Sequence, residues 1–83
     1  MALFMDVHEH IEGLTADAVR NAHRLDLEIQ DRYGVKCLNY WFNEGTGKVF
    51  CLIEAPDAEA ANAVHRDSHG LTADAIIEVQ EGS

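Results

Sequence analysis

Two apolar runs separated by a glycine-rich turn form the most strongly patterned part of the chain. They span residues 36–54, KCLNYWFNEGTGKVFCLIE, and the aromatic and β-branched residues gather on both sides of residues 44–47. This pattern predicts a β-hairpin, because two glycines within four residues supply turn conformations and such residues favour strands. A loop of two or four residues would place Asn43 opposite Lys48 and so set the register.

That register divides the hairpin residues between two faces of a sheet. One face, which we expect to be buried, comprises Leu38, Tyr40, Phe42, Val49, Cys51 and Ile53. The other face comprises Cys37, Asn39, Trp41, Phe50, Leu52 and Glu54. Because the two cysteines fall on opposite faces, we expect free thiols and no disulfide between them.

The rest of the chain alternates between strand and helix patterns. Residues 2–8 alternate with a period of two, which is typical of a half-buried strand. Residues 15–34 carry helical spacing between a capping threonine and a terminal glycine, and residues 57–70 do the same after a capping aspartate. Residues 75–80 predict a last strand.

The element order β-α-β-β-α-β predicts one ferredoxin-like domain of the α+β class over residues 1–83. Such a sandwich has a four-stranded antiparallel sheet with two helices on one face. We expect the first strand to lie parallel to the third, beside it, and the two helices to run in the same direction. The uncovered face would carry Phe4, Trp41, Phe50 and Leu52, so we expect a homodimer packed sheet to sheet, as in a dimeric α+β barrel.

The acidic balance narrows the classes of partner. Fifteen Asp and Glu against six Lys and Arg give a net charge of −9, which argues against nucleic acid and favours small cations, although a merely soluble surface shows the same balance. No apolar run reaches the roughly 18 residues of a membrane span, and the N-terminus lacks the pattern of a signal peptide. We therefore expect a cytoplasmic protein with no membrane partner.

Five histidines in so short a chain are its main chemical anomaly. His65 and His69 are spaced i, i+4 on the second predicted helix, so both rings leave the same side. His23 and His65 lie at equal distances from their helix caps, and Asp26 falls near the level of His69, so parallel helices would bring all four together. Imidazoles with a carboxylate suit a borderline divalent ion such as nickel, zinc, cobalt or copper. The alternative is surface decoration.

A second candidate cluster depends on the expected pairing of the first and third strands. Parallel pairing would place Asp6 and His8 on the open face with Glu54, Cys37 and Asn39, at one end of the sheet. Carboxylates and an imidazole are again metal-competent ligands. The alternative is an ordinary polar rim.

The sequence carries no motif of a known catalytic class. It has no glycine-rich phosphate loop, no GxSxG elbow and no CxxC pair, so we predict a protein that is not an enzyme. The rival hypothesis is a small dimeric α+β-barrel oxygenase or ligand-binding module, in which Asn39, Trp41 and His8 line a pocket on the open face. That hypothesis rests on fold analogy.

Four segments together resemble the small bacterial nickel-binding proteins of a domain-of-unknown-function family: MDVH, AHRLDLEIQDRYGV, YWFNEGTGKVFCLIEAPDAE and NAVHRDSHG. The resemblance covers nearly the whole chain, and FCLIEAPDAE followed by HRDSHG is its most specific part. It implies a ferredoxin-like protomer, a dimer whose sheets form a barrel, bound nickel and no established catalytic activity. It also implies metal roles for His8, His65 and His69, and extends to Glu54 and His23.

These observations predict a divalent metal-binding protein that acts in nickel storage, buffering or response. Histidine ligands must be deprotonated to bind, so we expect metal affinity to fall as the pH drops through the histidine range, near about pH 6.

Overall fold

The computed structural model describes residues 1–82 and contains the predicted order of elements. The strands are β1 (Ala2–His8), β2 (Lys36–Asn43), β3 (Lys48–Ala55) and β4 (Ala75–Val79). The helices are α1 (Ala16–Ile29), which continues into a 3₁₀ turn, η1 (Gln30–Tyr33), and α2 (Ala58–Ser68). Ser83, the last residue of the predicted domain, lies outside the described residues.

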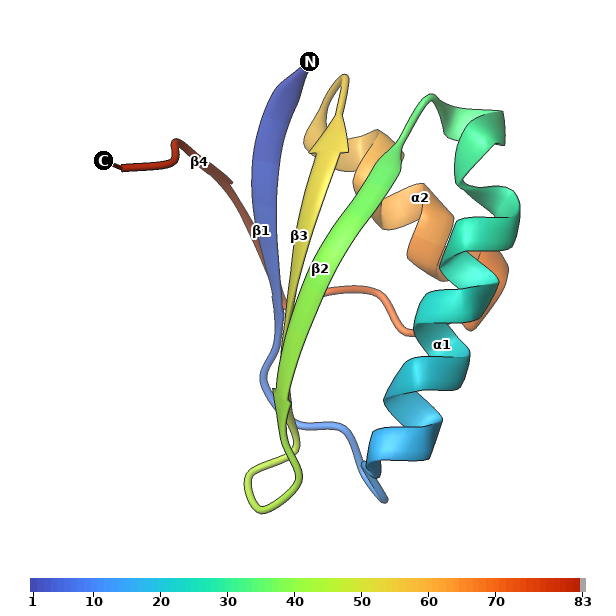
Figure 1. Cartoon of the computed structure of the whole chain (residues 1–83), viewed down its shortest axis with the longest axis vertical. Coiled ribbons are helices and arrows are strands. Elements are labelled where there is room, and N and C mark those ends of the chain that lie inside the picture. The colour runs from blue at the N-terminus through green and yellow to red at the C-terminus, as the bar shows by residue number, and fades with distance from the viewer. Residues whose placement is uncertain (83) are drawn as a thin grey trace.

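The strands form one sheet in the order β2-β3-β1-β4, in which every neighbouring pair is antiparallel. Figure 1 shows α1 and α2 side by side over one face of this sheet, while the opposite face carries no helix. The ferredoxin-like α+β fold predicted from the sequence is confirmed.

The expected direction of β1 relative to β3 was wrong. The two strands pair antiparallel, with Ala2 opposite Ala55 and His8 opposite Val49. A right-handed crossover through α1 makes β1 parallel to β2, and the hairpin makes β2 antiparallel to β3, so β1 must oppose β3. The helices consequently run in opposite directions, as Figure 1 shows, and the expectation of a common direction was also wrong.

The hairpin register is confirmed from its turn to the middle of its strands and then changes at a β-bulge. Tyr40 pairs with Cys51 as predicted, but Cys37 pairs with Ile53 and Leu38 is the extra residue. The bulge turns the small Cys37 side chain into the core and leaves Leu38 exposed, so both were assigned to the wrong face. The Cys37 backbone N–H donates to the Gln30 side chain at 2.9 Å, which ties the bulge to η1.

Both helices begin at the predicted caps. The Thr15 hydroxyl accepts from the Ala18 N–H at 3.1 Å, and the Asp57 carboxylate accepts from the Ala60 N–H at 2.8 Å. Each bond satisfies a donor of the first turn that has no partner within its helix. Gly34 ends the first helical segment with φ +66°, the left-handed conformation that glycine adopts most easily.

Two apolar clusters fill the space between helices and sheet. The first comprises Phe4, Val35, Cys37, Ile53, Ala55, Ala61 and Val64, and the second comprises Leu14, Val19 and Val49. Phe4, which we expected on the open face, is buried in the first cluster because β1 presents its even-numbered residues to the helices. Between the two clusters lie four buried polar side chains, Asp6, His8, Asp26 and His65, and these form the candidate site.

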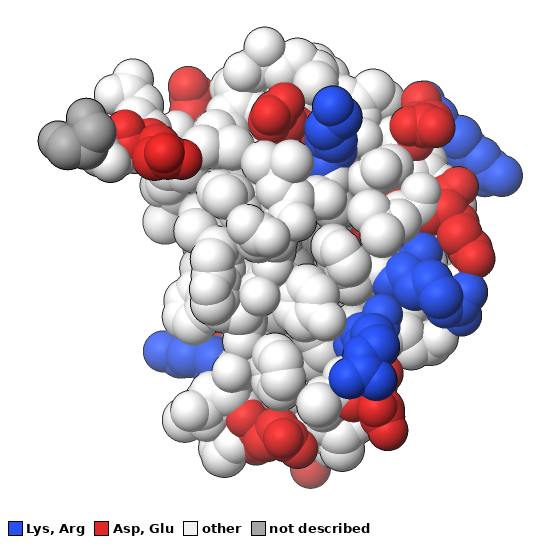
Figure 2. Space-filling model, viewed as in Figure 1, with Lys and Arg blue, Asp and Glu red and all other residues white. Residues whose placement is uncertain are grey.

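The uncovered face of the sheet is largely apolar. Trp41, opposite Phe50, is 49% exposed, and Ile77, opposite Met5, is 56% exposed. Figure 2 shows a broad uncharged surface over the strands, whereas Lys, Arg, Asp and Glu side chains gather over α1 and toward the ends of the sheet. No helix among residues 1–82 is long and apolar enough to cross a membrane.

Candidate metal centre

The site begins with two side chains of β1 that point toward the helices. Asp6 lies opposite Cys51 and is 0% exposed, and His8 lies opposite Val49 and is 5% exposed. The two residues share a face because side chains alternate along a strand. An aspartate buried so completely requires a compensating partner, because an unpaired charge in the protein interior is costly.

His65 of α2 supplies that partner. Its Nε2–H donates to Asp6 Oδ2 at 2.6 Å, and its Nδ1–H donates to Asp26 of α1 at 3.1 Å. Both partners are carboxylates, which only accept, so the ring carries both protons and is an imidazolium. Burial alone would lower the pKa of His65, but the two carboxylates raise it well above the usual histidine range. One side chain thus joins β1, α1 and α2.

Asp26 is held by three donors from α2 and its C-terminal end. Besides His65, the Ser68 hydroxyl donates to Oδ1 at 2.5 Å and the His69 Nε2–H donates to Oδ1 at 3.1 Å. Burial would raise the pKa of this carboxyl, but the bonds from His65, His69 and Ser68 hold it well below its usual range. Asp26 therefore remains ionised and fixes the relative position of the two helices.

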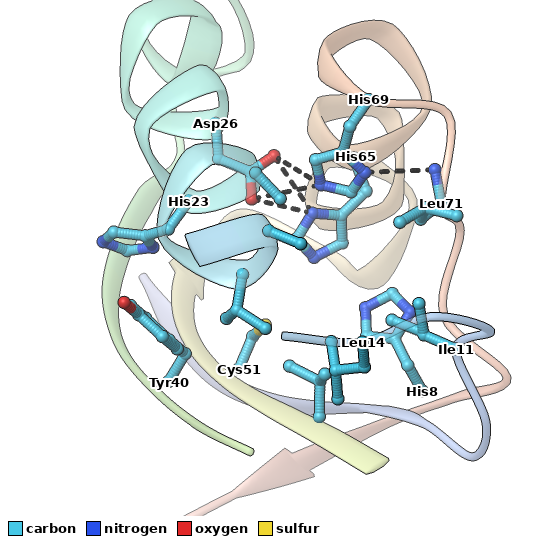
Figure 3. A pocket seen from close by; sticks show the side chains of 14 residues that line it. His8, Ile11, Leu14, His23, Asp26, Tyr40, Cys51, His65, His69 and Leu71 are labelled. Carbon is cyan, nitrogen blue, oxygen red and sulfur yellow. Dashed lines mark hydrogen bonds and ion pairs between the residues drawn. The ribbon is translucent and has the colours of Figure 1, made fainter. Parts of the chain in front are cut away.

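The protonation of His69 follows from its two contacts. The Leu71 backbone N–H donates to Nδ1 at 3.1 Å, so Nδ1 carries no proton and Nε2 does. Figure 3 shows this Nε2 directed toward Asp26, so its proton is donated to that carboxylate. Both nitrogens of His69 are thus engaged, and a metal ion could bind this ring only by replacing one of the two bonds.

Asp6 Oδ1 is the unsatisfied atom of the cluster. It is buried and, among the described residues, has no hydrogen-bond partner, although His8 Nε2 lies 3.5 Å away. Two ligands of one ion at about 2.1 Å are separated by about 3.0 Å in octahedral and about 3.4 Å in tetrahedral geometry, so this pair is spaced for a shared ion. Burial lowers the pKa of His8, which keeps the ring neutral and a nitrogen lone pair available.

Cys51, which the sequence predicted only as a core residue, completes this group. One ligand atom each of Asp6, His8, Cys51 and His65 lies within 4.8 Å of the others. Burial raises the pKa of the Cys51 thiol to about 11, so an ion would have to displace its proton in order to bind sulfur. Cys51 could have been predicted as part of this group if β1 and β3 had been paired antiparallel, because that register places it directly opposite Asp6.

A second group shares His65 with the first. Asp26, His65 and His69 also offer ligand atoms within 4.8 Å of one another. Five of the predicted metal residues therefore come together: Asp6, His8, Asp26, His65 and His69. Members of both expected clusters therefore meet at His65, because Asp6 and His8 point toward the helices rather than the open side.

The other two predicted metal residues, Glu54 and His23, belong to neither group. Glu54 pairs with Leu3 on the opposite face of the sheet from Asp6, so the expected open-face cluster does not form. His23 packs against Tyr40, with ring centroids 4.7 Å apart, because in antiparallel helices equal distances from the caps do not give equal levels. The pocket of the oxygenase hypothesis is not assembled either, since His8 and Trp41 lie on different faces.

Comparison with known proteins gives two findings. The sequence model of the family "Nickel responsive protein SCO4226-like" matches residues 4–79. The crystal structure of SCO4226 from Streptomyces coelicolor A3(2) superimposes with a TM-score of 0.91 at 38% identity, covering 99% of this chain and 100% of that one. No match was found among curated proteins.

Proposed function

The chain belongs to the SCO4226-like family of nickel-responsive proteins, and on that premise we propose that it binds a divalent metal ion through Asp6, His8 and His65. The observation that carries the proposal is the buried Asp6 Oδ1, which has no hydrogen-bond partner within residues 1–82 and lies 3.5 Å from a neutral imidazole. A cation between these two atoms would give the orphaned oxygen a partner and use the free lone pair of His8.

The remaining residues of the cluster support a metal ion in this position between Asp6, His8 and His65. An ion would replace the proton that Asp6 and His65 share at 2.6 Å, while the Nδ1–H of His65 would stay on Asp26. A carboxylate on the far nitrogen of a metal-bound histidine fixes the ring and strengthens its donor atom. His69 and Ser68 would then act on the ion only through Asp26.

The group of Asp26, His65 and His69 is the second candidate position for a metal ion. It is less suited, because every one of its ligand atoms is already engaged in a hydrogen bond and the His69 ring has no free nitrogen. The two positions face opposite nitrogens of His65, Nε2 toward Asp6 and Nδ1 toward Asp26, so both could be filled together only if this ring lost both of its protons.

We propose nickel as the natural ion, with cobalt, zinc and copper also able to bind a mixed imidazole and carboxylate site. The role that suits such a site is storage, buffering or response to the metal in the cytoplasm, without catalysis. The description of the family as nickel-responsive supports this assignment.

A homodimer formed through the open sheet face is part of the proposal. The apolar side chains Trp41 and Ile77 are half exposed there, and a chain of 83 residues buries only about 60% of its unfolded surface on its own. Covering this face with a second copy would remove those side chains from water.

The test is a calorimetric nickel titration of tag-free protein at pH 7.5, comparing wild type with His8→Gln and His10→Gln. His10 is a matched control, because it lies two residues beyond His8 but is exposed and forms hydrogen bonds to Thr46 and Glu12, outside the metal centre. We expect His8→Gln to weaken nickel binding by at least about 10- to 100-fold, since a ligand is lost, and His10→Gln to leave it unchanged. Equal affinities of wild type and His8→Gln would overturn the proposal.

A further inference from the structure

A cavity of about 70 Å³ adjoins the metal centre between α1 and the sheet. Figure 3 shows it bounded by Tyr40 and His23 on one side, by Asp26 and His65 above, and by His8 on the other side. One water site takes about 10 to 15 Å³ of cavity volume measured with a water-sized sphere, so the cavity has room for about five atoms of that size. The cavity is therefore large enough for a small ligand and far too small for a peptide.

The cavity exists because α1 turns small side chains toward it. Ala18 and Ala22 line it from α1, where larger residues would have closed the gap to Val49 of β3. Leu14 and Val19 complete an apolar wall. Exposed residues also reach the lining, since Ala18 is exposed and Leu71 is 42% exposed, so the cavity opens to solvent.

The polar wall of the cavity is the metal centre itself. His8, Cys51 and His65 line the cavity, whereas Asp6, which is fully buried, does not and lies behind them. An ion held by Asp6, His8 and His65 would therefore have protein on its Asp6 side and the cavity on its open side. Coordination positions of the ion that these three residues leave free would face the apolar cavity, which opens to water.

The charges of the centre select the kind of ligand. A divalent ion balances the carboxylates of Asp6 and Asp26 once the histidines around it are neutral, so an anion entering the cavity would be buried without a counter-charge. A neutral molecule meets no such cost, and its carbon atoms match the apolar wall. Borderline divalent ions accept neutral aromatic nitrogen readily.

We propose that this cavity binds a small neutral azole, a planar ring with one donor nitrogen, which coordinates the metal ion from the side opposite Asp6. The inference rests on the proposed function for the ion and adds the second ligand. Nitrogen would occupy a coordination position that water otherwise fills, while the ring carbons pack against Leu14, Val19 and Ala22. No covalent bond of the azole is broken.

The experiment uses tag-free protein loaded with cobalt, whose visible absorption reports changes of ligand. Cobalt affinity is measured first, and imidazole and azide are then titrated in parallel, with the protein-bound cobalt quantified after ultrafiltration. We expect a saturable spectral change with imidazole, no change with azide at equal concentration, and cobalt retained on the protein.

Variants connect the spectral change to the cavity. Ala22→Leu should fill the cavity and weaken imidazole binding at least tenfold with cobalt affinity unchanged, and Ala18→Leu, at the exposed part of the lining, should act in the same direction. Asn21→Leu adds the same side chain at an exposed neighbouring position of α1 outside the lining and should leave imidazole affinity unchanged.

The outcomes separate the two proposals. If the wild type binds no cobalt, both fail. The azole site alone fails if cobalt binds but imidazole does not, if azide binds equally well, if imidazole strips the ion, or if a folded Ala22→Leu or Ala18→Leu variant binds imidazole as the wild type does.

Discussion

Among single residues, the buried imidazolium of His65 is the central group of the metal site. It is paired with two carboxylates from different elements, Asp6 at 2.6 Å and Asp26 at 3.1 Å. Such a network does not have to stabilise the fold more than an apolar replacement would, but removing one partner leaves a buried charge without compensation. The two carboxylates make this ring both a structural link and a ligand that must lose a proton before it can bind a metal.

The pH dependence of nickel affinity should reveal that proton. Because the pKa of His65 is raised far above 6.5, the ring is an imidazolium at pH 7 to 9, and an ion that binds Nε2 must release one proton. Nickel affinity should therefore rise about tenfold per pH unit from about pH 7 to 9, beyond the range expected for ordinary histidines. Titrations in several buffers would measure both slope and proton release. A flat affinity over this range would show that His65 keeps its proton and is not a ligand.

Asp26→Asn should destabilise the metal-free protein by about 3 kcal/mol, because it removes one charge of a buried network. The pKa of Asp26 is lowered in the folded state, so its stabilisation is present above the ordinary value of 3.8 and is lost as the pH falls through the folded pKa. Urea unfolding at pH 7 and at pH 3 would test this. We expect the difference from wild type to shrink at pH 3, and a difference below about 1 kcal/mol at pH 7 would contradict the account.

The sequence predicted that histidines and carboxylates would gather, but not all of their positions. The structure brings His65, His69 and Asp26 together. The i, i+4 spacing of the two histidines needed only helix geometry, whereas Asp26 was placed near them by assuming helices that run in the same direction, which they do not. Asp6 and His8 were assigned to the wrong face, because alternation along a strand defines two faces without saying which one meets the helices. Once the antiparallel pairing is known, the same alternation brings both residues to His65.

At the scale of elements, the β2-β3 turn and the loop after β1 support each other. Gly47 has φ +78°, and its carbonyl accepts from the Ile11 N–H at 2.9 Å. A Cβ at Gly47 would lie 2.8 Å from His10 Nδ1 and 3.0 Å from the Ile11 backbone. This close approach positions the loop that carries Ile11 and Leu14 into the lining of the cavity.

Gly47→Ala should therefore destabilise the protein by about 2 to 3 kcal/mol, from the left-handed backbone and the contact with Ile11 together. Gly45→Ala is the matched control in the same turn: its φ is not positive and its Cβ would meet only the Asn43 side chain, at 3.2 Å. We expect a change within about 1 kcal/mol for the control. Similar free energies of unfolding for the two variants would contradict this view of the turn.

Elements with local signals were the predictable part of the fold. The caps at Thr15 and Asp57 and the glycine at position 34 act within one or two turns of chain, and all three were found from the sequence. The bulge at Leu38 was not found, because it depends on packing of Cys37 against the core and on the bond from its N–H to Gln30. A change of register made by such tertiary contacts leaves no pattern in the strand itself.

At the scale of the whole molecule, the apolar open face predicts self-association. Ile77→Asp places a charge on that face, on strand β4 opposite Met5 and away from the metal centre. We expect the wild type to sediment as a dimer at about 10 μM and the variant to shift toward monomer, because a charge buried in an apolar interface is left without a partner. A wild type that sediments as a monomer at this concentration would contradict the proposed homodimer.

The most direct measurement of the central claim is anomalous diffraction at the nickel edge from crystals of tag-free protein loaded with nickel at pH 8. We expect the strongest anomalous peak at about 2.1 Å from Asp6 Oδ1, His8 Nε2 and His65 Nε2, with Asp26 still bonded to His65 Nδ1. Nickel found only on exposed histidines such as His10, with Asp6 Oδ1 still lacking a partner, would contradict it.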